Sequence, residues 1–202
     1  MKHKQSTLLF LVLALCISCG NKTDREALRN ARNYLTEYYT TPELHNEKTL
    51  EKGYAELKKN SDFERNGLTV KNYDVVYPLL TELKKYDELE KLLLKDNAIP
   101  TKLMNSMGLN IVRYKKEYGI DRNKANMYMR NNLTLMEEQM KKFPEDSTQL
   151  MGYFTIIGYL YGKEKTLKKI DSMQASNKKY SNFYYHIIKR GIESYDDSFM
   201  DQ

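Results

Sequence analysis

The sequence predicts an all-α protein whose helices pair as hairpins. Apolar residues recur at three- and four-residue spacing along most of the chain. No segment shows the sustained apolar/polar alternation, rich in valine or threonine, that is typical of strands. Three of the four prolines, Pro42, Pro100 and Pro144, fall where helices would end. Helix is therefore expected nearly throughout, after an N-terminal segment of a different kind.

The periodicity places the helices at 24–39, 47–59, 72–85, 87–95, 102–118, 122–142, 148–161, 164–174 and 182–195. The stretch 61–69, which contains Gly67, is expected to be a loop. Pro78 lies inside a predicted helix and is tolerable there if Asp74 caps that helix, because first-turn amides have no helical partner. Further N-caps are expected at Asp121, Ser147 and Ser181.

Tight turns near Tyr86-Asp87, Gly119-Ile120 and Gly162-Lys163 divide these helices into hairpins, spaced 33 and 43 residues apart. Two helices share one pattern of large, aliphatic, small and aromatic or aliphatic residues: Phe154, Ile157, Gly158 and Tyr161, and Met104, Met107, Gly108 and Ile111. This pattern resembles the first helix of the tetratricopeptide repeat, and the resemblance covers about 70–195. It implies an irregular α-solenoid of helical hairpins. The alternative is an irregular helical bundle, because the same spacing marks the apolar face of any buried helix.

The first twenty residues have the anatomy of a secretory signal. Lys2 and Lys4 precede an apolar run, 8–17, which is too short for a comfortable membrane span. The run ends at Ser18-Cys19-Gly20, which resembles the lipobox of bacterial lipoproteins. The resemblance implies a signal peptide over 1–18, a diacylglyceryl group on the Cys19 sulfur with its freed amine acylated, and a short tether over 19–23. A soluble secreted form or an uncleaved anchor are the alternatives.

This resemblance also implies a location and a lipid partner. A single domain, 24–202, would be held in the bacterial cell envelope, expected at the outer membrane, with the leaflet and face left open. Several acyl chains anchor stably where one chain is marginal. The tether is short, so the domain would sit close to the bilayer.

Composition narrows the chemistry further. Cys16 and Cys19 are the only cysteines, so the mature domain has no thiol for a disulfide or a thiolate metal site. Removal of 1–18 takes away two lysines and no acids, and the formal charge falls from +6 to +4. Ordinary solubility explains that charge better than lipid binding does. Nucleic acid is not expected as a partner of an exported lipoprotein.

Catalytic signals are sparse. The mature chain has two histidines, His45 and His186, and no phosphate loop, dinucleotide fingerprint or nucleophile elbow. Neither a cofactor nor a metal is expected, and the chain is not predicted to be an enzyme. Asp146-Ser147-Thr148 resembles an O-glycosylation motif of some exported bacterial proteins, which makes Ser147 a candidate site. Helix capping by Ser147 is the alternative.

Tyrosines suggest a binding surface. The chain has seventeen tyrosines and no tryptophan, and six of the tyrosines crowd two of the last helices. Phe154 and its helical neighbours already supply one apolar face, so the remaining apolar side chains are expected to form a second face, buried against another helix or open to a partner. Tyrosine suits partner contact because it buries area and keeps a polar tip. The residues expected to bind a partner are Tyr153, Ile156, Tyr159, Tyr184 and Tyr185, with core packing as the alternative for each.

Together these patterns predict a lipid-anchored exported scaffold that holds a protein or peptide near the membrane. The alternative is a periplasmic immunity or inhibitor lipoprotein that neutralises a toxin or an enzyme. An enzyme would need a pocket in which distant acids and a histidine converge.

Overall fold

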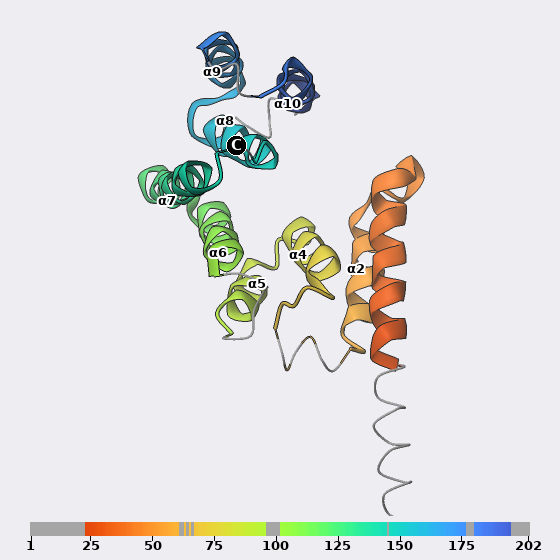
Figure 1. The fold of residues 1–202 in the computed structure, drawn as a ribbon. Coiled ribbons are helices and arrows are strands. Elements are labelled where there is room, and N and C mark those ends of the chain that lie inside the picture. The colour runs from red at the N-terminus through yellow and green to blue at the C-terminus, as the bar shows by residue number, and fades with distance from the viewer. Residues whose placement is uncertain are drawn as a thin grey trace, which may run out of the picture. The chain divides into compact units, whose positions relative to one another are not determined.

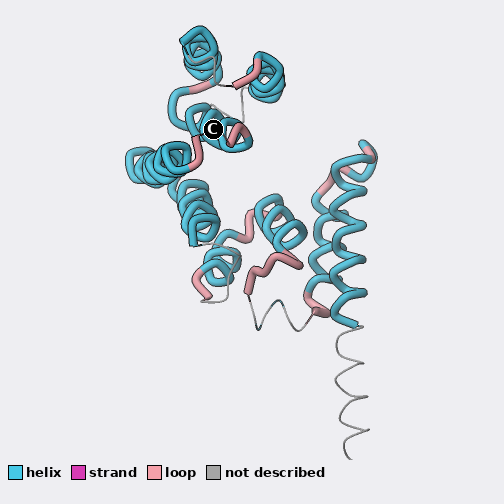
Figure 2. Tube along the Cα trace, in the orientation of Figure 1, coloured by secondary structure: helices cyan, strands magenta, loops and turns pink. Residues whose placement is uncertain are grey.

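A computed structural model shows an all-α chain, which confirms the fold class predicted from the sequence (Figure 1). It describes residues 23–60, 63, 65, 67–95, 102–144, 146–176 and 180–194, and none of these is in a strand. Figure 2 shows helices and loops, and no strand, in the described part of the chain. After helix 23–40 come η1 (Pro42–Leu44), α2 (Glu47–Leu57), α4 (Tyr73–Glu82), α5 (Tyr86–Leu93), α6 (Lys102–Glu117), α7 (Arg122–Lys142), α8 (Thr148–Tyr161), α9 (Lys163–Ser176) and α10 (Asn182–Ser194).

The chain forms two compact units, where the sequence suggests one domain. The division falls between Asn105 and Ser106, inside α6. Each unit has its own buried side chains, so each is considered by itself.

In the N-terminal unit, helix 23–40 and α2 pack closely at Gly53. A Cβ on this glycine would lie 3.2 Å from the Tyr34 Cβ, which is tighter than most Cβ contacts, so the absence of a side chain at Gly53 favours this close approach. The side chain of Asn46 begins α2 by accepting a hydrogen bond from the Thr49 amide at 3.1 Å. Helix 23–40 is also tied to α4, because Nε and Nη2 of the Arg32 guanidinium donate to the Asp74 carboxylate at 2.9–3.1 Å.

The expectation that Asp74 caps α4 is wrong, because Asp74 forms this ion pair with Arg32 instead. The helix begins at Tyr73, after Asn72 in the N-cap position, and Asp74 lies in its first turn. Asp74 bonds Arg32 instead, because a guanidinium offers a carboxylate two parallel donors. The Asn72 side chain stabilises the preceding turn by accepting from the Thr69 amide and donating to the Gly67 carbonyl. Pro78 is accommodated inside the helix without capping by Asp74.

The predicted loop 61–69 is wrong in part. Phe63 and Arg65 are helical, and Phe63 is fully buried. The Asn60 side chain accepts a hydrogen bond from the Phe63 amide at 3.1 Å, three residues on, as an N-cap does. The buried Phe63 ring and the Asn60 cap therefore stabilise helical residues here. The spacing of apolar residues in the sequence does not predict them.

The first predicted hairpin turn lies slightly earlier than expected. Helix α4 ends at Glu82, and Lys84 takes a positive φ of 55° in the turn before α5 begins at Tyr86. Polar contacts then hold α5 against α2. The Tyr54 hydroxyl donates to the Glu88 carboxylate at 2.7 Å, and the Lys58 ammonium pairs with the same carboxylate at 2.8 Å.

In the C-terminal unit, α6 and α7 form the first hairpin, and the turn predicted at Gly119-Ile120 is confirmed. Asp121 caps α7 as predicted, because its carboxylate accepts from the amides of Asn123 and Lys124 at 3.0 and 3.1 Å. Asn132 of α7 is fully buried yet satisfied. Its side chain accepts from the Asn110 amide at 2.7 Å and donates to the Met107 carbonyl at 3.0 Å.

Helix α8 packs against α7, α9 and α10 and forms the centre of this unit. It ends at Gly162, the predicted turn, which adopts φ 81° and ψ 167° and is followed at once by α9. This backbone conformation is essentially restricted to glycine. The single-residue turn therefore depends on Gly162, and it folds α9 back onto α8.

Candidate binding surface

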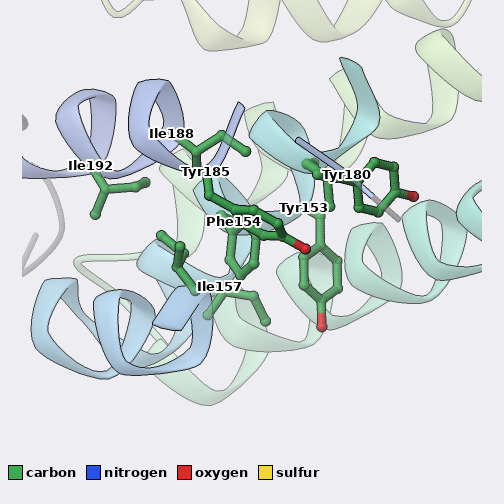
Figure 3. Close-up of a cluster of buried hydrophobic side chains, with 9 residues drawn as sticks. Tyr153, Phe154, Ile157, Tyr180, Tyr185, Ile188 and Ile192 are labelled. Atoms are coloured by element: carbon green, nitrogen blue, oxygen red, sulfur yellow. The ribbon is translucent and has the colours of Figure 1, made fainter. Parts of the chain in front are cut away.

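Two of the four tyrosines expected to bind a partner lie in the core of the C-terminal unit (Figure 3). Tyr153 and Tyr185 pack in one cluster of α8, α9 and α10 side chains, and they are 5% and 0% exposed. Ile156, also 5% exposed, is buried on the same helix. These three residues cannot contact a partner in this structure, and the core-packing alternative holds for them.

The reason is the position of α8 between its neighbours. A helix that is apolar nearly all round is either buried on several sides or carries an exposed surface. Phe154 and Ile157 face the cluster that includes Tyr153, while Tyr159 and Leu160 pack against a second cluster built around Tyr114 of α6. Helix α8 is therefore covered on two sides.

Tyr159 is half-buried and meets Tyr114 edge to face, with ring centroids 5.4 Å apart. Burial raises the pKa of Tyr114 to about 12, with a smaller contribution from Tyr118. Tyr161, expected in the core as part of the repeat pattern, is instead 46% exposed at the end of α8. The tetratricopeptide-like spacing predicts that all four of its positions in α8 are buried. Three of them are buried, and Tyr161 is not.

Tyr184 is the one predicted partner-binding residue that is exposed, and it has two exposed apolar neighbours. Phe183, Tyr184 and Ile187 are 67%, 42% and 41% exposed on α10. We name these three residues the α10 outer face. The rings of Phe183 and Tyr184 lie 6.3 Å apart and nearly perpendicular. Arg190, one turn further along the helix, is also exposed.

Phe183 and Ile187 are absent from the predicted set, although the sequence contains a signal for them. Tyr185, Ile188 and Ile192 are the buried side chains of α10, at spacing i, i+3 and i+7. Residues 183 and 187 then fall on the opposite side of the helix. Two apolar residues opposite an apolar stripe are a departure from a simple amphipathic helix.

Polar contacts fix α10 on α9 and thereby position the outer face. The Lys189 ammonium pairs with the Asp171 carboxylate and also donates to the Gln174 side-chain oxygen at 3.0 Å. The Gln174 amide in turn donates to Asn182 at 3.1 Å. At the start of the helix, the Tyr180 hydroxyl donates to the Pro144 carbonyl at 2.9 Å. These contacts hold both ends of α10 while its outer side stays open.

Ser147, the candidate O-glycosylation residue, lies at the N-cap position of α8 and is half-buried. Its side chain makes no capping hydrogen bond. The local turn is stabilised instead by the Gln149 amide, which donates to the Asp146 carboxylate at 2.9 Å. Lys142, Phe143, Pro144 and Asp146 line a largely apolar hollow of about 500 Å³ just before this turn. Glycosylation of Ser147 stays a prediction, and the capping alternative is wrong for its side chain.

The two histidines belong to different units. His45 stacks on Tyr38 with ring centroids 4.1 Å apart, and its Nδ1 lies 3.1 Å from the Tyr38 carbonyl oxygen, so it supports the turn after helix 23–40. His186 is exposed on α10. Among the described residues, no three histidine, cysteine or acidic side chains gather as a metal ion would require.

Cys19 and the rest of the predicted signal lie outside the described residues. Within the described part, no helix combines the length and the apolar character needed to cross a membrane. Comparisons with models of protein families, with curated proteins and with solved structures found no match. The lipoprotein and tetratricopeptide resemblances therefore stay predictions from the sequence.

Proposed function

We propose that this chain is a lipid-anchored exported binding protein, which holds a protein or peptide partner near the membrane. The anchor would be the acylated Cys19, as the signal-like segment over 1–20 suggests. The helical hairpins would form the scaffold. Attachment to the bacterial cell envelope, at its outer membrane, is part of the same proposal.

The observation that carries this proposal is the α10 outer face. The side of a helix that faces solvent is normally polar. Helix α10, the last described helix, instead exposes Phe183, Tyr184 and Ile187. Aromatic side chains dominate the energetics of protein interfaces, because each buries a large area at a small entropic cost. The outer face thus has the composition of a small interface centre.

The net charge of the C-terminal unit suggests which residues of the partner lie around the α10 outer face. Residues 106–202 contain 16 lysines and arginines against 12 aspartates and glutamates, an excess of four that equals the whole formal charge of the mature chain. Arg190 lies beside the outer face and is exposed. Complementary charge at an interface rim speeds association and selects partners. We therefore expect an apolar partner segment with acidic residues at its edge.

Crosslinking in cells that produce the full chain tests the proposal. The variant Phe183→Ala with Tyr184→Ala removes the two rings, and both side chains are exposed, so folding is expected to persist. Ile120→Ala with Met127→Ala is the matched control, because it removes exposed apolar side chains from the α6–α7 hairpin. We expect a partner that crosslinks to the parent chain and the control and is lost with the ring variant.

Equal crosslinking of both variants would contradict the α10 outer face as the binding site. The identity of the crosslinked protein distinguishes a scaffold from an immunity or inhibitor lipoprotein. A partner that harms the cell only when this chain is deleted would favour an immunity or inhibitor lipoprotein. A partner without such toxicity would favour the scaffold.

A further inference from the structure

A polar cleft lies between helix 23–40 and α2 in the N-terminal unit. Its volume is about 320 Å³, and its lining residues are Asn30, Asn33, Tyr34, Glu37 and Glu56. The first four are spaced i, i+3, i+4 and i+7, so they form one stripe along helix 23–40. Glu56 of α2 contributes the opposite wall. The cleft belongs to a different unit from the α10 outer face and does not depend on that proposal.

The negative charge of Glu56, on one wall of the cleft, is balanced by residues of the protein itself. The Lys59 ammonium contacts its carboxylate, and the Asn30 side-chain amide donates to it at 3.2 Å. Lys59 first, and Asn30 second, hold the pKa of Glu56 below its usual range. Glu56 is therefore ionised, and its charge is balanced by Lys59.

The other wall carries polar groups that remain available to a ligand. Among the described residues, the Glu37 carboxylate, the Asn33 amide and the Tyr34 hydroxyl have no hydrogen-bond or ion-pair partner. The Tyr34 Cβ lies beside Gly53 of α2, where the two helices approach each other. The cleft thus combines an aromatic residue, hydrogen-bond acceptors and one uncompensated negative charge.

We propose that this cleft binds a primary alkylammonium group. Each N–H of such a cation needs an acceptor, and the Glu37 carboxylate and the Asn33 amide oxygen supply acceptors on one side. The Tyr34 ring adds a favourable surface for a cation. The net charge of the lining with Lys59 included is −1, which favours a monocation over an anion. The volume lies at the lower end of the range for small-molecule sites.

The ammonium could come from a free small amine or from a lysine side chain of a peptide. A titration of the full-length protein followed by nuclear magnetic resonance of the asparagine side-chain amides distinguishes them. The probes are n-butylammonium, with 1-butanol as its neutral counterpart, and acetyl-Ala-Lys-Ala-amide, with norleucine in place of lysine as its control. We expect the Asn33 amide, identified by its loss in Asn33→Ala, to shift saturably with the charged probes only. If n-butylammonium saturates the shift and the peptide does not, the ligand is a free amine. If both saturate it, the cleft also binds a lysine side chain.

Two matched variants distinguish binding of the ammonium group in the cleft from non-specific attraction of a cation to the protein's negative charges. Glu37→Gln removes the uncompensated charge and should weaken n-butylammonium binding about tenfold. Glu43→Gln removes the same charge from the exposed η1 turn, outside the cleft lining, and should leave binding unchanged. Equal weakening by both variants, or equal shifts with 1-butanol, would overturn the proposal. So would the absence of a saturable Asn33 shift with either charged probe.

Discussion

Replacing Tyr185 with phenylalanine should stabilise the protein, although the residue lies in the middle of a core. Tyr185 is 0% exposed, and its hydroxyl is buried without a hydrogen-bond partner in the described structure. Burial also raises the pKa of this phenol, so the group is neutral. A buried, unpaired polar group costs about 1–3 kcal/mol. Tyr185→Phe removes that cost and keeps the ring.

A second tyrosine in the same cluster supplies the matched comparison. Tyr180 is also buried, but its hydroxyl donates to the Pro144 carbonyl at 2.9 Å. Tyr180→Phe removes the same atom, and we expect it to lower the free energy of unfolding by about 1 kcal/mol. The two variants should therefore differ by roughly 2 kcal/mol or more, with opposite signs relative to the parent chain.

Urea unfolding followed by circular dichroism measures both changes. An unchanged slope against urea would show that the same surface is exposed in each variant, so the midpoints can be compared directly. For a protein of this size, each kcal/mol corresponds to about 2–4 °C in melting temperature. A loss of stability in Tyr185→Phe as large as that in Tyr180→Phe would contradict an unpaired Tyr185 hydroxyl. It would show that a partner, such as a buried water, satisfies the Tyr185 hydroxyl.

Three further predictions follow from particular contacts. Asp121→Ala should lower the free energy of unfolding by about 1 kcal/mol, because two amides at the start of α7 lose their acceptor, and thermal melting would measure it. Gly162→Ala should cost about 1–3 kcal/mol in urea unfolding because φ 81° with ψ 167° is strained for alanine, whereas Gly119→Ala, at a site with open space around it, should cost less. The pKa of Glu56 is lowered by Lys59 and Asn30, so its ionised form adds stability above the unfolded pKa that is lost as pH falls through the folded pKa. Urea midpoints between about pH 7 and about pH 3 should therefore fall less steeply in Glu56→Gln; a slope equal to the parent's would contradict this role.

Local signals were sufficient to predict most of the helices. Helix α7 begins after the Asp121 cap and ends before Pro144, and α8 ends at Gly162, so each boundary is encoded by a residue next to it. The role of Asp74 was not predictable in this way. Its partner Arg32 lies 42 residues earlier, and only the packed unit brings the two side chains together.

The candidate binding residues were harder to predict, for a related reason. Periodicity shows which side chains share a face of a helix, but it does not show how many neighbours cover that helix. Tyr153 packs in the same cluster as Phe154, and Tyr159 packs against a second cluster around Tyr114, so neighbouring helices cover α8 on two sides. On α10 the same periodicity does separate the buried Ile188 from the exposed Ile187, so the outer face was accessible from the sequence.

The most direct test of lipid anchoring, on which the proposed function depends, is the intact mass of the protein from the membranes of cells that produce it. We expect a mature chain that begins at Cys19 and carries acyl chains, and we expect this species to be lost in Cys19→Ala. An unmodified mass in the soluble fraction would contradict the anchor, and the proposed location and the membrane-proximal partner would fall with it.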